Sequence, residues 1–170
     1  SITGIEQRKY IPPNLKTSDI AYYAAQKAIE DAQLDPETLD YIIVAHNFGD
    51  ISSSSKQIDT LPSLASRVKT LLKIQNPSCV AYDILFGCPG WVEAMIQAQA
   101  FIKAGMAKKC LVIGADALSR VVDIHDRDSM IYADGAGATI IEATNEEGGI
   151  LAHETATYTY DEAHFLFFGK

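Results

Sequence analysis

The stretch Tyr82-Asp83-Ile84-Leu85-Phe86-Gly87-Cys88-Pro89-Gly90-Trp91-Val92-Glu93-Ala94-Met95 decides the fold. The apolar run over 80–86 predicts a buried strand. Small and apolar residues at helical spacing after Trp91 predict a helix over 89–104. Pro89 suits the first turn of that helix, because its missing N–H costs nothing there. The pattern therefore places Cys88 in a tight turn between a strand and a helix.

Cys88 is the candidate nucleophile of the chain. The helix amides point at it, and their partial positive charge favours the thiolate, which is the nucleophilic form of cysteine. Gly87 and Gly90 allow a substrate carbonyl to approach the backbone closely. The alternative is a small buried hydrophobic residue, which is the usual state of a free cysteine. That structural interpretation is favoured for Cys79 and Cys110, which lie in or beside predicted core strands.

The rest of the chain alternates between strands and helices, which predicts an α/β layered fold. The run Tyr41-Ile42-Ile43-Val44-Ala45 predicts a strand covered on both faces, as in a parallel sheet. The polar segment 47–59, with four serines, predicts a flexible surface loop. The remaining elements are expected as helices over 17–31 and 61–72 and as strands over 78–85, 108–115, 135–143 and 150–157.

Composition narrows the classes of function. The 170 residues are 48% hydrophobic and 21% charged, as expected of one globular domain. No apolar run approaches the ~20 residues that span a bilayer, so no membrane insertion is expected. The net charge of −8 argues against a nucleic-acid partner. Three cysteines without metal-ligand spacing predict no metal site and a reducing, cytoplasmic location.

Four segments in register resemble β-ketoacyl-acyl carrier protein synthase III, a family of the thiolase-like superfamily. Asp83-x-x-x-x-Cys88-x-Gly90 resembles its nucleophile motif, and 111–116 resembles the strand after the nucleophile helix. Tyr132-Ala133-Asp134-Gly135-Ala136-Gly137-Ala138 resembles its glycine-rich block. Thr3-Gly4-Ile5 with Arg8 resembles a segment near the family's amino terminus. The resemblance covers about residues 3–150.

The resemblance implies a thiolase-like half over residues 1–170, with a mixed five-stranded-type sheet and helices on both sides. It implies that the opening strand and the carboxy-terminal half are absent. It also implies a condensing acyltransferase of fatty acid or polyketide biosynthesis. Cys88 would accept an acyl group from coenzyme A and condense it with a malonyl-acyl carrier protein, with no permanently bound cofactor. The catalytic His and Asn of the family would lie outside this chain, so the chain alone is expected to be inactive in condensing acyl and malonyl thioesters.

The resemblance also assigns further residues. Arg127 matches an arginine at the coenzyme A entrance, and Leu118 and Tyr132 match positions near the acyl pocket. A surface ion pair for Arg127 and ordinary core packing for the other two remain open alternatives. His46 is expected to be structural. A homodimer is expected through residues 78–85, paired with their copy across a two-fold axis.

Two other functions remain open from the sequence. One is another thiolase-like acyltransferase, similar to 3-hydroxy-3-methylglutaryl-coenzyme A synthase. The other is a non-catalytic, partner-binding subunit of the same fold, although such a subunit would not need the thiol of Cys88. Pro89 stands where the family has a small residue, so the priming substrate could differ from acetyl-coenzyme A.

Overall fold

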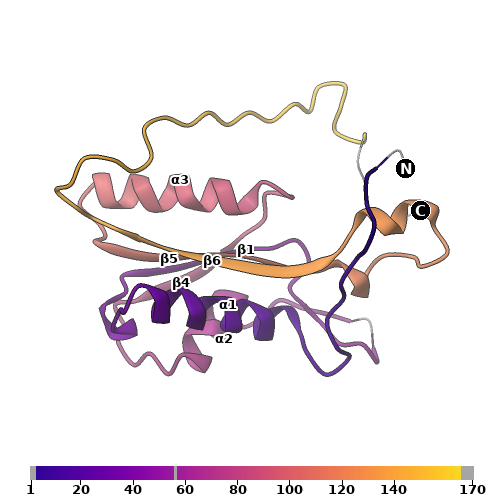
Figure 1. Ribbon diagram of the computed structural model, residues 1–170, viewed down its shortest axis with the longest axis horizontal. Helices are drawn as coiled ribbons and strands as arrows, with labels where there is room; N and C mark the ends of the chain where they lie inside the picture. The colour runs from indigo at the N-terminus through magenta and orange to yellow at the C-terminus, as the bar shows by residue number, and fades with distance from the viewer. Residues whose placement is uncertain (1–2, 56, 166–170) are drawn as a thin grey trace.

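The computed structural model describes residues 3–55 and 57–165, which form a three-layered α/β structure (Figure 1). A four-stranded sheet of order β4-β1-β5-β6 lies between helices α1 and α2 on one face and α3 on the other. The helices are α1 (Thr17–Asp31), α2 (Leu64–Leu71) and α3 (Gly90–Lys103), and the sheet strands are β1 (Tyr41–Ala45), β4 (Val80–Ile84), β5 (Lys109–Ala117) and β6 (Asp134–Glu142). The smaller elements are the hairpin strands β2 (Asp50–Ile51) and β3 (Ile58–Asp59) and the 3-10 turns η1 (Pro36–Thr38), η2 (Leu118–Arg120) and η3 (Arg127–Ile131).

Strand β1 is central and pairs in parallel with both β4 and β5. Ile42, Ile43 and Val44 are fully buried, because helices cover both faces of the strand. Ile42 and Val44 pack toward α1 and α2, whereas Ile43 packs toward α3. This alternation confirms the predicted strand and explains why every position in it is apolar.

The mixed sheet with helices on both sides is confirmed, but the expected fifth strand is not present among the described residues. β6 runs antiparallel to β5, and residues 150–157 are extended and mostly exposed instead of forming a strand. Their segment leaves the sheet and runs past α3 (Figure 1). Gln99 Nε2, on α3, donates to the Ile150 carbonyl at 2.7 Å. Strand propensity in these residues finds no neighbouring strand to pair with.

The predicted flexible loop over 47–59 was wrong in part. It contains the short antiparallel hairpin β2–β3, in which Asp50 and Ile51 are buried. Asp50 accepts hydrogen bonds from Ser18 N at 2.8 Å and Ser18 Oγ at 2.6 Å, at the start of α1. A long-range polar contact therefore orders a segment whose composition alone favours disorder.

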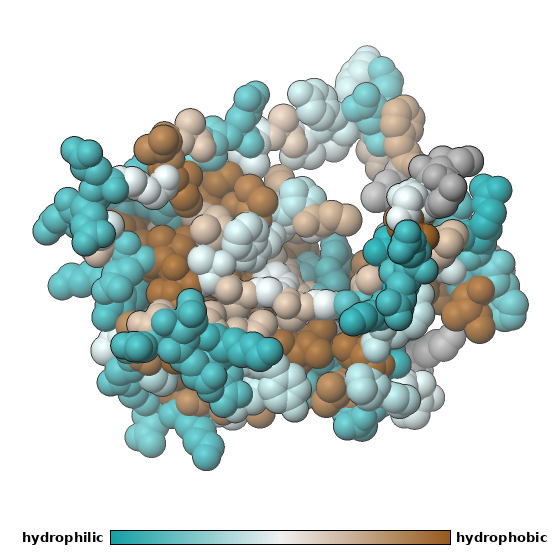
Figure 2. Space-filling view, viewed as in Figure 1, coloured by the Kyte–Doolittle hydropathy of each residue, from teal (hydrophilic) through white to brown (hydrophobic). Residues whose placement is uncertain are grey.

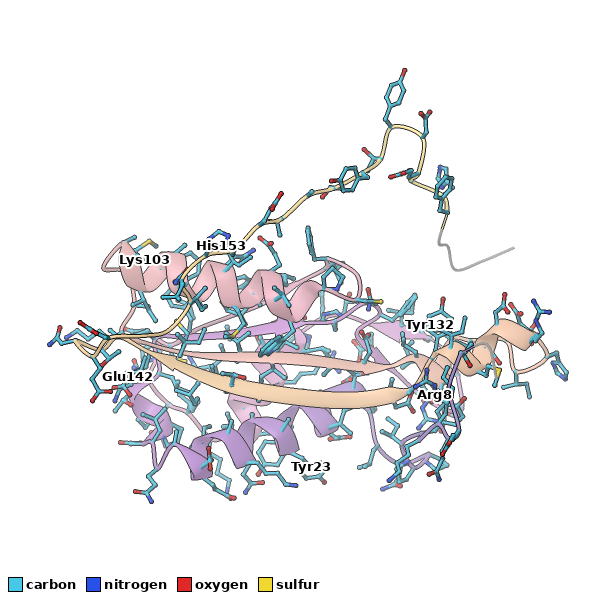
Figure 3. The ribbon with its side chains drawn as sticks, turned by 45° about the horizontal axis from the view of Figure 1, so that its top comes forward. Arg8, Tyr23, Lys103, Tyr132, Glu142 and His153 are labelled. Atoms are coloured by element: carbon cyan, nitrogen blue, oxygen red, sulfur yellow. The ribbon has the colours of Figure 1, made fainter. Side chains whose placement is uncertain are left out.

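The segment between β5 and β6 is held by the amino-terminal strand-like stretch. Arg8 Nε donates to the Met130 carbonyl at 2.8 Å, and Arg8 Nη2 donates to the Ile131 carbonyl at 2.6 Å. Arg8 and Tyr132 consequently lie at the same end of the sheet (Figure 3). Within 3–55 and 57–165, none of the helices combines the length and the apolar character required to cross a bilayer.

Candidate active site

Two glycines, Gly87 and Gly90, form the turn that carries Cys88. Gly87 has a φ of +66°, a left-handed conformation that L side chains rarely adopt. Gly90 N donates to the Gly87 carbonyl at 3.1 Å, and α3 begins at Gly90. Cys88 is exposed at this junction, whereas Cys79 and Cys110 are buried. The predicted strand-to-helix turn is therefore present.

The start of α3 rests directly on the sheet, because two glycines provide the space. A β-carbon at Gly90 would lie 3.1 Å from the β-carbon of Ala45, at the end of β1. A β-carbon at Gly114 on β5 would lie 3.0 Å from the β-carbon of Trp91. Neither distance leaves room for an added side chain without displacement. The position of the Cys88 turn is thus fixed by close contact with β1 and β5.

Cys88 opens onto a cavity of about 320 Å³ at the carboxyl ends of β1 and β5. Ligands of open α/β sheets generally bind beyond the carboxyl ends of the strands. The wall comprises Ala45, Gly87, Cys88, Trp91, Gly114, Ala115, Asp116, Ala133, Asp134 and Gly135.

Two carboxylates line this cavity, and both are engaged by the backbone of neighbouring segments. Asp116 accepts from Asn47 N at 2.9 Å and Asn47 Nδ2 at 2.6 Å. Burial raises the pKa of Asp116, and the hydrogen bonds from Asn47 oppose that rise. Asp134 accepts from Ile11 N at 2.8 Å, Ser119 N at 2.8 Å and Ser119 Oγ at 2.6 Å. These contacts fasten three loops around the mouth of the cavity.

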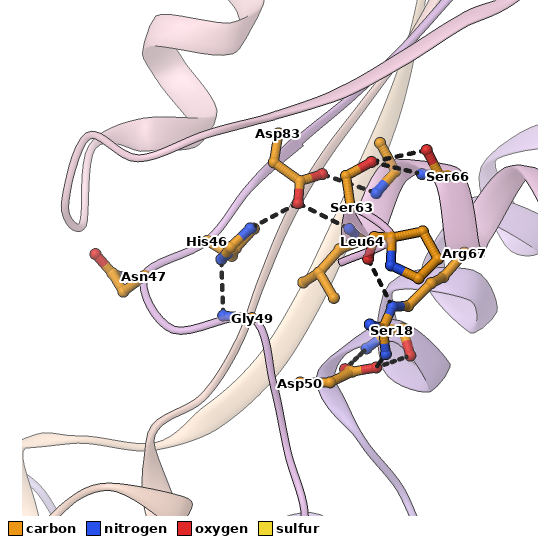
Figure 4. A network of polar contacts seen from close by, with 12 residues as sticks. Ser18, His46, Asn47, Gly49, Asp50, Ser63, Leu64, Ser66, Arg67 and Asp83 are labelled. Atoms are coloured by element: carbon orange, nitrogen blue, oxygen red, sulfur yellow. Dashed lines mark hydrogen bonds and ion pairs between the residues drawn. The ribbon is translucent and has the colours of Figure 1, made fainter. Parts of the chain in front are cut away.

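A polar network behind the Cys88 turn anchors the end of β4 to α2 (Figure 4). Asp83 accepts from Leu64 N at 2.7 Å, from Ala65 N at 2.8 Å and from His46 Nε2 at 2.9 Å. Gly49 N donates to His46 Nδ1 at 2.9 Å, so the proton of the neutral ring lies on Nε2. The Asp83 carboxylate, five residues before Cys88 in the sequence, therefore caps the amino terminus of α2.

Arg67 extends the network to the β2–β3 hairpin. Its Nη1 donates to Asp50 Oδ2 at 2.8 Å, its Nη2 donates to Asp59 Oδ1 at 2.7 Å, and its Nε donates to the Pro62 carbonyl at 2.8 Å. The Asp59 contact raises the pKa of Arg67, and the guanidinium lowers the pKa of Asp59. One side chain thereby holds the segment from β2 to the start of α2.

Sequence reasoning missed this network, although one signal was available. Asp83 interrupts an otherwise apolar strand, and a carboxylate in such a position needs nearby donors. His46 was expected to be structural, which agrees with its buried place and its two hydrogen bonds. It is absent from the wall of the Cys88 cavity.

The other predicted site residues lie at the same end of the sheet but outside that wall. Leu118 begins η2 and is half-buried, and Tyr132 directly follows η3. Arg127 begins η3 with an exposed side chain, and its Nε lies 3.5 Å from Asp128 Oδ1. Neither Leu118 nor Tyr132 lines the Cys88 cavity in this chain. Arg127 has a neighbouring carboxylate, as the alternative interpretation of a surface ion pair requires.

The described part of the chain contains no group of three or more His, Cys, Asp or Glu residues arranged to hold a metal ion. His125 lies in an exposed loop, where Asp123 Oδ1 is 3.2 Å from its Nδ1. His153 lies on the exposed segment beyond β6 (Figure 3). Cys88 is accordingly the candidate reactive group of the cavity.

Known proteins are similar to this chain in both sequence and fold. Residues 82–159 match the family described as 3-Oxoacyl-[acyl-carrier-protein (ACP)] synthase III. The chain is 42% identical over 152 residues to β-ketoacyl-[acyl-carrier-protein] synthase III 1 of Vibrio parahaemolyticus, covering 89% of this chain and 45% of the relative. It is also 42% identical over 159 residues to β-ketoacyl-[acyl-carrier-protein] synthase III of Neisseria gonorrhoeae, covering 93% and 47%.

Solved structures agree. The crystal structure of 3-oxoacyl-[acyl-carrier-protein] synthase III from Aquifex aeolicus superposes with a TM-score of 0.74 at 35% identity, covering 85% of this chain and 44% of that one. The priming β-ketosynthase of the R1128 polyketide pathway, at 23% identity and a TM-score of 0.75, shares the fold.

The layered sheet and the cysteine turn define a protein of the thiolase-like class. Within that class, the chain is similar to β-ketoacyl-acyl carrier protein synthase III, by the match over residues 82–159 and by 42% identity to the two relatives named above. It spans about half the length of the curated relatives that it matches.

Proposed function

We propose that this chain is the acyl-accepting half of a condensing acyltransferase, with Cys88 as the nucleophile. The observation that carries the proposal is the exposed Cys88 at the start of α3, opening onto a cavity at the carboxyl ends of β1 and β5. The same stretch lies within the region of similarity to synthase III.

In the first step, the Cys88 thiolate attacks the carbonyl of an acyl-coenzyme A and forms an acyl-cysteine thioester. Coenzyme A leaves as its thiolate and takes up the proton that the Cys88 thiol had released. In the second step, a malonyl thioester on acyl carrier protein loses CO2, and its carbanion attacks the acyl-cysteine. The product is a 3-oxoacyl thioester on the carrier, and Cys88 is regenerated. The backbone N–H of Cys88 is one donor for the oxyanion formed in each step.

The remaining assignments form part of the same proposal. Arg127, exposed on η3, contacts coenzyme A through stacking or phosphate pairing. Leu118 and Tyr132, at the same end of the sheet but outside the wall of the Cys88 cavity, border the part of the acyl group farther from the thioester, and no permanently bound cofactor takes part. The complete protein acts in the cytoplasm on acyl carrier protein, as a homodimer joined through the open edge of β4.

The test is acyl transfer to Cys88, followed by intact-mass spectrometry. Incubation with an acyl-coenzyme A is expected to add one acyl group, and peptide mapping is expected to find it on Cys88. Cys88→Ala should remove the adduct without unfolding the protein, whereas Val92→Ala, an exposed change outside the cavity wall, should retain it. An adduct that persists in Cys88→Ala would show that another residue is the acyl acceptor.

The proposed contact of Arg127 with coenzyme A is tested in a separate experiment. Arg127→Ala should raise the acyl-coenzyme A concentration needed for half-maximal labelling and leave the maximal labelling rate unchanged. The neighbouring Asp128→Ala is the matched control, because it removes the carboxylate and keeps the guanidinium. Equal effects of both substitutions would indicate a local ion pair without a role in binding.

A further inference from the structure

Trp91 is the single tryptophan of the chain, and it lies three residues after Cys88. Its position is fixed from below by Gly114. A β-carbon at 114 would lie 3.0 Å from the Trp91 β-carbon and 3.5 Å from both Cγ and Cδ1. Gly114 has no left-handed φ, so space, not backbone conformation, requires a glycine there. The Trp91 β-carbon and the adjoining atoms of the indole thus lie close over Gly114 on β5.

The rest of the cavity wall makes Trp91 distinctive. Six of the ten lining residues are alanine or glycine. Two others, Asp116 and Asp134, are held in place by hydrogen bonds from Asn47, Ile11 and Ser119. Apart from Cys88 itself, this leaves Trp91 as the one large side chain among the lining residues. It remains 37% exposed, and apolar side chains gather around α3 on the surface in Figure 2.

We propose that Trp91, seated on Gly114, is a specificity-determining residue for the acyl group carried by Cys88, which rests on the function proposed above. Cys88 lies in the turn just before α3 and Trp91 lies in its first turn, and both line the same cavity. The indole therefore borders the acyl carbons nearest the thioester, not the far end of a chain. A flat, anchored side chain at that point admits unbranched acyl groups and obstructs groups branched beside the carbonyl.

Two isomeric thioesters test this selectivity. Butyryl-coenzyme A and isobutyryl-coenzyme A contain the same atoms and differ in branching next to the carbonyl. The measured quantity is the ratio of their rates of Cys88 acylation, followed by intact mass. The protein should prefer butyryl, and Trp91→Ala should raise the isobutyryl-to-butyryl ratio roughly 10-fold, the scale of one methyl group in an apolar pocket.

Gly114→Ala should act in the opposite direction, because the added methyl group displaces the indole from β5 toward the cavity. Val92→Ala is the matched control, since Val92 is adjacent to Trp91, exposed and outside the cavity wall. Its ratio should equal that of the unmodified protein. Absence of any Cys88 adduct would overturn the proposed function. Normal acylation with an unchanged ratio in Trp91→Ala would overturn the role of Trp91 alone.

A second measurement uses the protein with Trp91 unchanged. Because Trp91 is the sole tryptophan, selectively excited emission reports its surroundings. Butyryl-coenzyme A should change that emission in step with Cys88 acylation, and Cys88→Ala should show no such change. Emission that stays constant while the adduct forms would mean that the indole is not beside the acyl group.

Discussion

The Asp83 carboxylate offers a sharp test of how the Cys88 turn is supported. Asp83→Ala removes the acceptor of the Leu64 and Ala65 amides and of His46 Nε2, at 2.7, 2.8 and 2.9 Å. Loss of a helix cap costs about 1 kcal/mol. The buried imidazole N–H left without a partner adds about 1–3 kcal/mol. The free energy of unfolding should therefore fall by about 2–4 kcal/mol, which corresponds to a Tm lower by roughly 5–15 °C.

Urea and thermal unfolding, followed by circular dichroism, measure this loss. Asp19→Ala is the matched control, because Asp19 accepts a solvent-exposed hydrogen bond from Lys16 N at the start of α1. It should cost only about 0.5–1 kcal/mol. A double-mutant cycle with His46→Ala should give a coupling of at least about 0.5 kcal/mol with Asp83. A loss in Asp83→Ala no larger than in Asp19→Ala, without coupling, would refute the reasoning.

Three further outcomes are expected. Iodoacetamide should label Cys88 before Cys79 and Cys110, because Cys88 is exposed and burial raises the pKa of both other thiols, to about 12 for Cys110; early labelling of Cys110 would contradict this. The raised pKa of Asp116 contributes stability that is present below pH ~4 and is lost as pH rises through the folded pKa. The free energy of unfolding of Asp116→Asn should therefore decrease less over that pH range than that of the unmodified protein. Identical dependences on pH in the two proteins would argue against a buried, titrating carboxyl. Light scattering should give a dimer, and Val80→Lys on the β4 edge should yield a monomer, whereas a monomeric parent protein would exclude the edge-to-edge interface.

Local patterns were sufficient for the elements that form the sheet. The continuous apolar run Tyr41–Ala45 and the glycine-bracketed Cys88 specify their structure through neighbours a few residues away. The helix predicted over 89–104 corresponds to Gly90–Lys103. These segments have consistent propensity, periodicity and turn chemistry, which is why their structure could be predicted.

Contacts between distant residues were not predictable in the same way. Asp50 is ordered by Ser18, 32 positions away, and His46 meets Asp83 across 37 positions. Residues 150–157 show the reverse error, because a sequence with strand propensity needs a partner edge to become a strand. The sequence patterns also did not predict the whole cavity wall. Trp91 lines the cavity and packs over Gly114, and that contact depends on the packing of α3 against β5.

The central place of β1 has a consequence for biosynthesis. β4 begins 35 residues after β1 ends, and β5 follows β4, so β1 is synthesised well before either of its partner strands. At roughly 5–20 residues per second, a ribosome needs roughly 2–7 s to complete the gap to β4. During that interval the nascent chain carries an apolar segment with two unpaired edges, and α1 is the one described helix of the sheet layers that already precedes it. Newly made chains should accordingly depend on holding chaperones at this stage, more than the finished sheet does.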